Sequence, residues 1–278
     1  IVSFFKDELV VGGFVLGFAF LISGFLFQLS KNDSKKKIFS NIFFCLSIIC
    51  IYLSGERSNF IKALIIASII LLLINDAHIY IKKKYIFLFI IIGLTLVTLI
   101  SEDTYNSQVR SYKKITRTTW LTHSLDVFLS TPTLYEKLGH LRHFAHYEVA
   151  WQIFKDYPIL GVGNLKFRYI CHNKKYLNAK IPSTLERCSN HPHQVHLEIL
   201  SEQGIIGYLI IIFTVFSILF NSFKIYRKTG DLIHLSSILF VLTFFIPLLP
   251  SGSFFSTFNG SIFWINFSLA HAFLNKPN

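Results

Sequence analysis

The sequence has no methionine and few charged residues. Only 15% of its 278 residues are Asp, Glu, Lys or Arg, whereas 52% are hydrophobic. Soluble domains carry about a quarter charged residues, so this composition excludes an ordinary soluble domain and predicts a membrane protein. Because methionine is missing even at position 1, we expect the sequence to begin inside a longer protein.

Acidic residues are scarce, with 15 Asp and Glu against 27 Lys and Arg and a net charge of +12. In a soluble protein this excess would indicate a nucleic-acid partner. Here much of the positive charge lies in short loops between apolar segments, which is typical of a topology signal in a membrane protein. We therefore expect no nucleic-acid partner. Internal repeats and low-complexity tracts are also missing.

Several apolar segments have about the length that a helix needs to cross the hydrocarbon core, roughly 20 residues. The candidate spans are 9–27, 38–54, 60–74, 85–100, 205–223, 232–249 and 254–274. The third contains Lys62, whose amine can extend from the helix toward the membrane surface. The pattern predicts an all-α polytopic membrane protein with about seven transmembrane helices.

Basic clusters predict the orientation of these spans. If seven spans alternate, the clusters at 31–37, 82–84 and 224–228 all lie on one side, which the positive-inside rule makes cytoplasmic. We divide the chain into a membrane part with four helices (1–100), a large loop on the opposite side (101–204), and a second membrane part with two or three helices (205–278).

The large loop is rich in histidine, and loops of this length without a role are uncommon. It contains eight of the eleven histidines: His123, His140, His143, His146, His172, His191, His193 and His196. Apolar spacing predicts a helix over 138–154, and Ser189 or Asn190 could cap another with Pro192 in its first turn. The loop is therefore expected to be mostly helical. If it faces an oxidising compartment, Cys171 and Cys188 can form a disulfide.

Three histidines and two carboxylates lie at the entrance to the fifth span: His191, His193, His196, Glu198 and Glu202. Titratable groups at a membrane border usually mark a site. Within a helix, His193 and His196 would share a face. Three interpretations stay open: solvated loop histidines, a zinc site, which the missing HExxH pattern disfavours, and a proton acceptor or anion donor near a helix N-terminus.

Arginines on the same side complete a cationic region. Arg57 lies in a tight turn between two spans, where it could bind lipid phosphate or pair with Glu56. Arg142 and Arg168 are further candidates in the loop. A substrate with an anionic group at headgroup depth and a polar part outside would suit this region. An anion or lipid transporter is the alternative, although transporter sites usually lie near the membrane midplane, often between repeated halves.

Four segments resemble those of one family. His193-Gln194, nine further residues and then Gly204-Ile205-Ile206-Gly207 resemble the H-[NSQ]-x9-G-x-x-G motif of the O-antigen ligases. Residues 191–204 also resemble the longer HPHN-type block of the ligase and polymerase superfamily, and 150–163 resemble its A-x-x-I-F-x-D-x-P-x-x-G-x-G segment. Residues 54–58 resemble its arginine turn, and residues 167–171 with Cys188 resemble the FRxxC and C-x-x-HPH pattern of a bacterial subgroup.

The resemblance implies a GT-C-type glycosyltransferase of the bacterial inner membrane with a large periplasmic loop. Such enzymes take a glycan from undecaprenyl pyrophosphate. Ligases pass it to lipid A-core, whereas O-antigen or exopolysaccharide polymerases pass it to another glycan acceptor. The implied partners are these two substrates and membrane lipid, and neither a metal nor another cofactor is expected.

The resemblance also assigns site residues. His193 takes the position of the motif histidine and Arg57 that of the inter-span arginine, and both are predicted to be catalytic. The family has a second arginine, and its position corresponds to His143 in this sequence, next to Arg142. This is a departure from the family pattern. Glu56 also departs, since the family has a small residue there. The residues predicted to bind substrate are Arg142, His143, Arg168, His191 and His196.

Overall fold

The computed structural model describes residues 11–30, 32–54, 56–74, 85, 142–177, 187–247 and 249–272. Within these ranges the chain forms helices and turns, and no strand is present. The predicted span 85–100, apart from its first residue, and the first part of the predicted loop, 101–141, lie outside the described residues. The part of the chain that is described is all-helical, as the sequence predicts.

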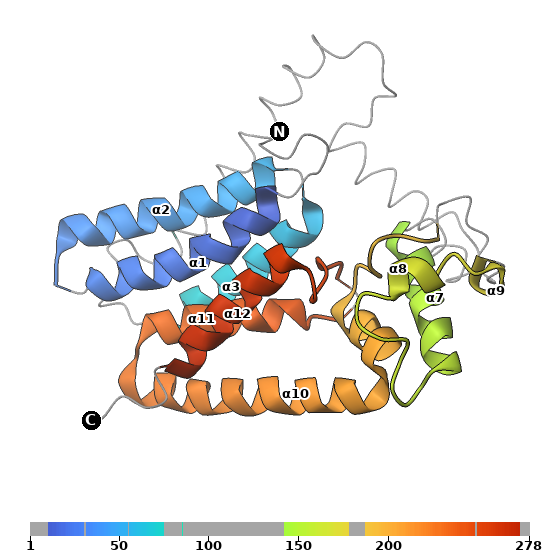
Figure 1. Ribbon diagram of the computed structural model, residues 1–278. Coiled ribbons are helices and arrows are strands. Elements are labelled where there is room, and N and C mark those ends of the chain that lie inside the picture. Colours follow the sequence, from blue (N-terminus) through green and yellow to red (C-terminus); the bar gives the residue numbers. More distant parts are fainter. Residues whose placement is uncertain are drawn as a thin grey trace, which may run out of the picture.

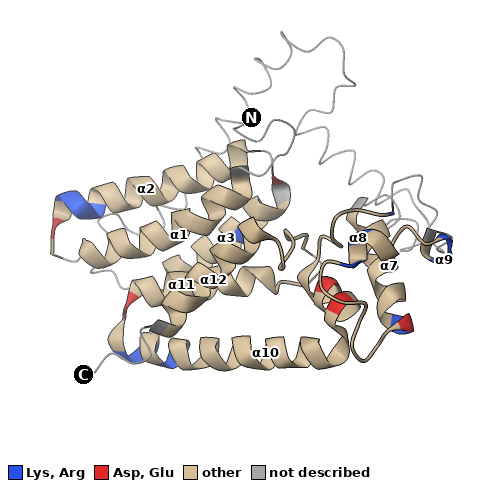
Figure 2. Ribbon diagram, in the orientation of Figure 1, with Lys and Arg blue, Asp and Glu red and all other residues tan. Residues whose placement is uncertain are grey.

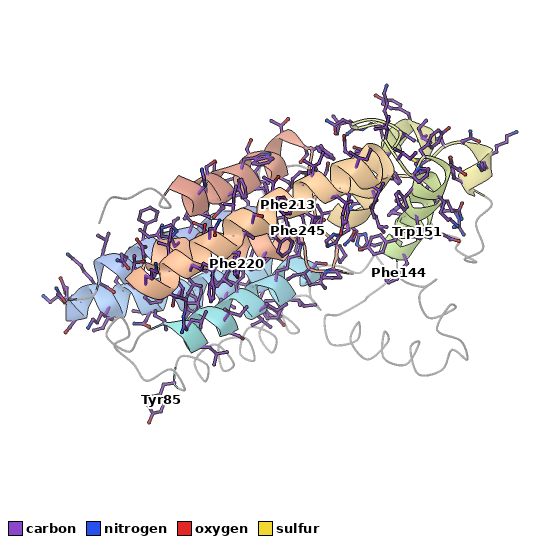
Figure 3. The ribbon with its side chains drawn as sticks, turned by 90° about the horizontal axis from the view of Figure 1, so that it is seen from below. Tyr85, Phe144, Trp151, Phe213, Phe220 and Phe245 are labelled. Carbon is purple, nitrogen blue, oxygen red and sulfur yellow. A yellow bond between two sulfur atoms is a disulfide. The ribbon has the colours of Figure 1, made fainter. Side chains whose placement is uncertain are left out.

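Three helices of the described residues are long and apolar enough to cross a membrane: α1 (Val11–Leu29), α2 (Ser34–Leu53) and α10 (Val195–Thr229). Charged residues gather at the ends of α10 and are missing from its middle (Figure 2). Outward side chains of the same helix are apolar, with Phe213 76% and Phe220 61% exposed (Figure 3). A long helix with an exposed apolar surface is expected to face lipid.

Three further apolar helices are α3 (Arg57–Leu73), α11 (Leu232–Phe244) and α12 (Thr257–Ala272), and the last two are shorter than the predicted spans. The prediction that α11 continues to 249 is wrong, because Pro247 disfavours helical backbone in the residue before it. The prediction that α12 begins at 254 is also wrong. Ser256 Oγ accepts the Asn259 N–H at 3.2 Å and so marks a later start.

The first loop between spans is shorter than expected. Helix α2 begins at Ser34, four residues before the predicted start, because Asp33 caps it. The Asp33 carboxylate accepts the N–H groups of Lys35 at 2.9 Å and Lys36 at 3.2 Å. The lysine cluster thus forms the first turn of the helix.

Helices α1, α2, α3, α11 and α12 form a bundle, and α10 runs along one side of it (Figure 1). One apolar core joins α1, α2, α3 and α11 around Phe20, Phe44, Ile48 and Ile66, all of which are fully buried. A second core joins α10 to α11 and α12 through residues that include Phe263. These two cores hold both ends of α10 in place relative to the bundle.

A small unit caps the N-terminal end of α10 (Figure 1). It consists of α7 (Arg142–Asp156), α8 (Phe167–Ile170) and α9 (Lys174–Leu177). Its own core contains Val149, Ile153, Phe167 and Tyr176. Helix α7 matches the predicted helix 138–154 within a few residues, although 138–141 lie outside the described residues. The predicted loop therefore contains a folded helical unit.

Helix α10 is broken at Gly204, where the backbone adopts φ 66° and ψ −170°. Backbone bonds join the residues on both sides of the break to the segment after α7: Ile205 N–H donates to the Pro158 carbonyl at 2.8 Å, and Val162 N–H donates to the Ser201 carbonyl at 3.0 Å. A Cβ at Gly204 would overlap the Ile159 carbonyl. Only glycine adopts this conformation readily and leaves room for the neighbouring backbone.

We expect Gly204→Ala to lower the free energy of unfolding by about 3 kcal/mol or more, since it adds both strain and a clash with Ile159. Gly230→Ala is the matched control. Gly230 has a similar φ of 68°, but a Cβ there meets nothing within 4 Å, so its cost should be about 1 kcal/mol. Thermal unfolding in detergent measures both variants. Equal losses would contradict the packing explanation.

Candidate active site

Four histidines gather where the small unit meets the start of α10. The ring of His193 lies 4.1 Å from that of His191, 4.9 Å from that of His143 and 5.2 Å from that of His146, measured between centroids. His143 and His146 are one turn apart on α7, whereas His191 and His193 lie in the segment before α10. His193 is therefore the ring that contacts all three others.

His193 does not lie in a helix. Gln194 is the N-cap of α10, and its side-chain oxygen accepts the Leu197 N–H at 2.8 Å. The predicted start, with Ser189 or Asn190 as the cap and Pro192 in the first turn, is therefore wrong. His193 has a positive φ of 60°, which is uncommon for a residue with a side chain. This conformation directs the chain from the preceding turn into α10.

The His193 carbonyl is held from two sides. The Ser251 N–H donates to it at 2.8 Å, and the Tyr147 hydroxyl donates to it at 3.4 Å. Burial raises the pKa of Tyr147, so the hydroxyl keeps its proton. Ser251 belongs to the turn between α11 and α12, and Tyr147 belongs to α7. Three separate parts of the chain thus set the backbone of this one residue.

The two carboxylates near the histidines serve as structural anchors. Glu198, 1% exposed, accepts the Ser253 hydroxyl at 2.5 Å and the Phe254 N–H at 2.8 Å. Glu202 accepts the N–H groups of Leu165 at 2.7 Å and Phe167 at 3.1 Å. Glu198 ties α10 to the turn that follows α11, and Glu202 ties it to the small unit.

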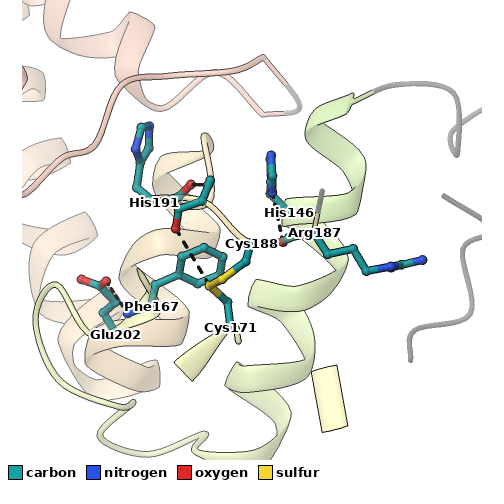
Figure 4. The surroundings of a disulfide bond; sticks show 8 residues. His146, Phe167, Cys171, Arg187, Cys188, His191 and Glu202 are labelled. Carbon is teal, nitrogen blue, oxygen red and sulfur yellow. Dashed lines mark hydrogen bonds between the residues drawn. A yellow bond between two sulfur atoms is a disulfide. The ribbon is translucent and has the colours of Figure 1, made fainter. Parts of the chain in front are cut away.

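A disulfide joins Cys171 and Cys188, whose Cα atoms lie 5.3 Å apart (Figure 4). Cys188 stands three residues before His191. The neighbouring Arg187 makes an ion pair with Glu148 at 2.9 Å, and its carbonyl lies 3.1 Å from His146 Nδ1. The disulfide and these contacts attach the segment before the histidines to α7.

Positive charge surrounds the imidazole rings. Burial lowers the pKa of His191, a hydrogen bond with the Ser251 backbone opposes this, and the charges of His146, His143 and Arg168 add to it, so that the pKa is about 4. His191 is therefore neutral at neutral pH. Its Nε2 and the Nε of Arg168 are buried and have no hydrogen-bond partner among the described residues. Such donors are available to an anionic ligand.

His196 has a different environment. Its Nδ1 lies 3.0 Å from the Tyr208 hydroxyl and its Nε2 lies 2.9 Å from the Phe245 carbonyl. It thus links the first turn of α10 to the next turns of the same helix and to the end of α11. The expectation that His193 and His196 share a helix face is wrong, because His193 precedes the helix.

Two predicted arginines begin helices. Arg57 is the first residue of α3 and Arg142 the first of α7, directly before His143. Their side chains lie outside what the structure describes. Between Arg57 and the end of α2, Glu56 accepts the Gly12 N–H at 2.5 Å and also the Asn59 side chain, so this carboxylate has partners other than arginine.

Sequence reasoning missed His146, Tyr147 and Ser251 as parts of the site. The spacing of three between His143 and His146 on a predicted helix would have identified His146. No local signal identifies Ser251, since it is 58 residues from the carbonyl that it contacts. In the described part of the chain, one group has ligand atoms close enough to share a metal ion: Cys171, His172 and Cys188. The disulfide uses both of its sulfurs.

The comparison with known families agrees with this geometry. The model of the O-antigen ligase family matches residues 42–212, which include α3, the small unit and the start of α10. The chain belongs to the O-antigen ligase family. Members of this family are glycosyltransferase-like enzymes that act on glycans and lipid-linked substrates, and the apolar helices agree with a membrane protein. A search of curated proteins finds no match.

The two glycine motifs share one structural explanation. Gly161 and Gly204 of this O-antigen ligase family member lie at the same contact, since a Cβ on Gly161 would overlap the backbone of Glu202. The D-x-P-x-x-G-x-G segment and the G-x-x-G segment are thus the two sides of one backbone interface. His143 and His146 lie near the start of α7, and His191 and His193 lie directly before α10, so the interface joins the two elements that carry the histidines.

We expect His191 by itself to lower the free energy of unfolding by about 2 kcal/mol as the pH drops from about 6.5 to 4. In this window the unfolded chain binds a proton at position 191 that the folded chain excludes. His191→Gln removes that difference and should flatten the pH dependence. Thermal unfolding between about pH 6.5 and 4 measures this pH dependence in the wild type and in the variant. His172→Gln, which changes an exposed histidine, is the control. An unchanged slope in His191→Gln would contradict the assignment.

Proposed function

We propose that this protein is a metal-independent, inverting glycosyltransferase. It transfers a glycan from undecaprenyl pyrophosphate to lipid A-core on the periplasmic face of the bacterial inner membrane. One observation supports this most directly: His193 is held in an unusual backbone conformation among three other imidazole rings at the entrance to α10, and one of these rings, His191, interacts electrostatically with Arg168. Membership of the O-antigen ligase family supports the reaction class.

We place seven spans in the chain, arranged as in GT-C enzymes, with 1–100 and 205–278 in the membrane and 101–204 in the periplasm. The charge pattern of the short loops supports this orientation. The Cys171–Cys188 disulfide supports a periplasmic location for the small unit, because such bonds persist in oxidising compartments.

The reaction proceeds by direct displacement. An acceptor hydroxyl attacks the anomeric carbon, the new glycosidic bond forms with inversion, and the bond to the pyrophosphate oxygen breaks. His193 accepts the hydroxyl proton, a role worth about 10²–10⁴-fold in rate. The charge that develops on undecaprenyl pyrophosphate is stabilised by Arg57, together with Arg142 or Arg168.

The remaining histidines have supporting roles. His143 and His191 bind oxygen atoms of the substrate, and the low pKa of His191 makes it a neutral partner rather than a cation. His196 acts indirectly, because both of its ring nitrogens are bonded, one to Tyr208 and the other to Phe245. These two bonds position the first turn of α10. The positive charge of the site matches a pyrophosphate group at headgroup depth.

We expect His193→Ala to lower glycan transfer in isolated membranes by 10²-fold or more, within the roughly 10²–10⁴-fold range for positioned proton transfer. Arg168→Ala should also lower it, whereas Arg168→Lys should restore part of the loss because it keeps the charge. His172→Ala changes an exposed histidine of the same unit and should keep wild-type transfer. Transfer at the wild-type rate by His193→Ala would remove His193 from the mechanism.

Deletion of the gene identifies the acceptor. Glycan that accumulates on undecaprenyl pyrophosphate while lipid A-core stays bare supports ligation. Surface glycan reduced to a single repeat indicates a polymerase instead. Anion flux in proteoliposomes without any glycan product would support the transporter alternative and contradict the proposed reaction.

A further inference from the structure

Lys62 is a buried amine in the second turn of α3. Its side chain is 5% exposed, and the helix continues with the buried residues Ala63, Ile66 and Ala67. A cation in a membrane helix is costly and usually marks a functional position. Its Nζ donates to the Pro250 carbonyl at 2.9 Å, in the turn between α11 and α12.

Two consecutive residues connect this amine to the site. Pro250 accepts the Lys62 bond through its carbonyl, and the next residue, Ser251, donates its N–H to the His193 carbonyl at 2.8 Å. Lys62 and Pro250 are 188 residues apart in the chain. Helix α3 is thus joined to the backbone of His193 through the turn between α11 and α12.

The turn needs such a bond to hold its position. Its residues, from Pro250 to Ser253, are not in a helix, and proline has no N–H to donate. Glu198 holds the far end through Ser253 and Phe254. Lys62 holds the near end, next to the amide that contacts His193. Without it, that amide is free to shift relative to α10.

The conformation of His193 depends on this amide. A positive φ in a residue with a side chain costs about 1–2 kcal/mol and persists only when its surroundings enforce it. The Ser251 amide and the Tyr147 hydroxyl both donate to its carbonyl. A change in φ would turn the His193 ring away from His143 and His146.

We propose that Lys62 is a positioning residue for His193 in the transfer reaction and that it acts through Pro250 and Ser251. This assignment rests on the proposed function. Helix α3 begins at Arg57 and therefore sets the backbone position of one predicted catalytic residue while Lys62 sets that of the other. Glu56 interacts electrostatically with Lys62 and offsets part of the cost of the buried charge.

The kinetic test uses Lys62→Met, which keeps the length of the side chain and removes the donor. We expect kcat to fall by about 10²-fold, the cost of a displacement of roughly 1 Å, with little change in KM. Lys62→Arg should restore part of kcat because it keeps a donor. Lys36→Met, which removes a 64% exposed lysine, is the matched control and should keep wild-type kinetics. A rise in KM without a fall in kcat would indicate that Lys62 contributes to substrate binding and would overturn the proposal.

A second kinetic test adds Lys62→Met to His193→Ala. If Lys62 acts only through His193, the double variant should transfer glycan at the rate of His193→Ala alone, because groups that act as a unit are not additive. A further 10²-fold fall in the double variant would show a separate role and overturn the assignment.

Hydrogen exchange tests the same link without any activity measurement. In Lys62→Met the amides of residues 251–254 should exchange faster than in the wild type, while residues 142–156 of α7 stay protected. Unchanged exchange at 251–254, or faster exchange throughout α7 and α10, would overturn the assignment. If the wild type transfers no glycan at all, the proposed function fails, and the exchange result still decides whether Lys62 holds the turn.

Discussion

The backbone of residues 158–163 lies directly against the backbone of residues 201–206, and the placement of the histidines depends on this contact. Hydrogen bonds between Val162 and Ser201 and between Ile205 and Pro158 join the two segments. Gly161 and Gly204 leave no room for a Cβ at the interface. Because one segment follows α7 and the other breaks α10, the contact sets how the rings on α7 meet the ring that precedes α10.

The charge of the site follows from how the acidic residues are used. Between residues 142 and 203, the described carboxylates all have structural partners: Glu148 binds Arg187, Asp156 binds Tyr176 and Lys175, and Glu198 and Glu202 bind backbone N–H groups. Bonds from Lys175 and Tyr176 lower the pKa of Asp156. These carboxylates are thus engaged in structural contacts, and Glu202 also interacts electrostatically with Arg168.

Local sequence predicted the helices well where apolar residues and capping signals agreed. The apolar segments of α1 and α2 and the spacing in α7 each identified a helix. The errors lie at the ends of helices. Pro192 predicted the first turn of α10, but Gln194 is the cap of this helix. Because the sequence stays apolar after Phe244, the prediction extended α11 past its actual end, which lies before Pro247. A side-chain cap or a proline outweighs hydrophobicity at such positions, because a single hydrogen bond decides where the helix begins or stops.

Residue types and short spacings were enough to identify a membrane protein of the O-antigen ligase family and to single out His193, since composition and motif glycines reflect local backbone and solvent requirements. Only the packing of helices placed Tyr147 and Ser251 on that histidine and Lys62 on the turn that contacts it. Their contacts join residues between 46 and 188 positions apart, and no periodic pattern reports such a distance. They exist because α7 and the turn after α11 meet at the start of α10 and α3 contacts that same turn, and this arrangement is a property of the folded chain as a whole.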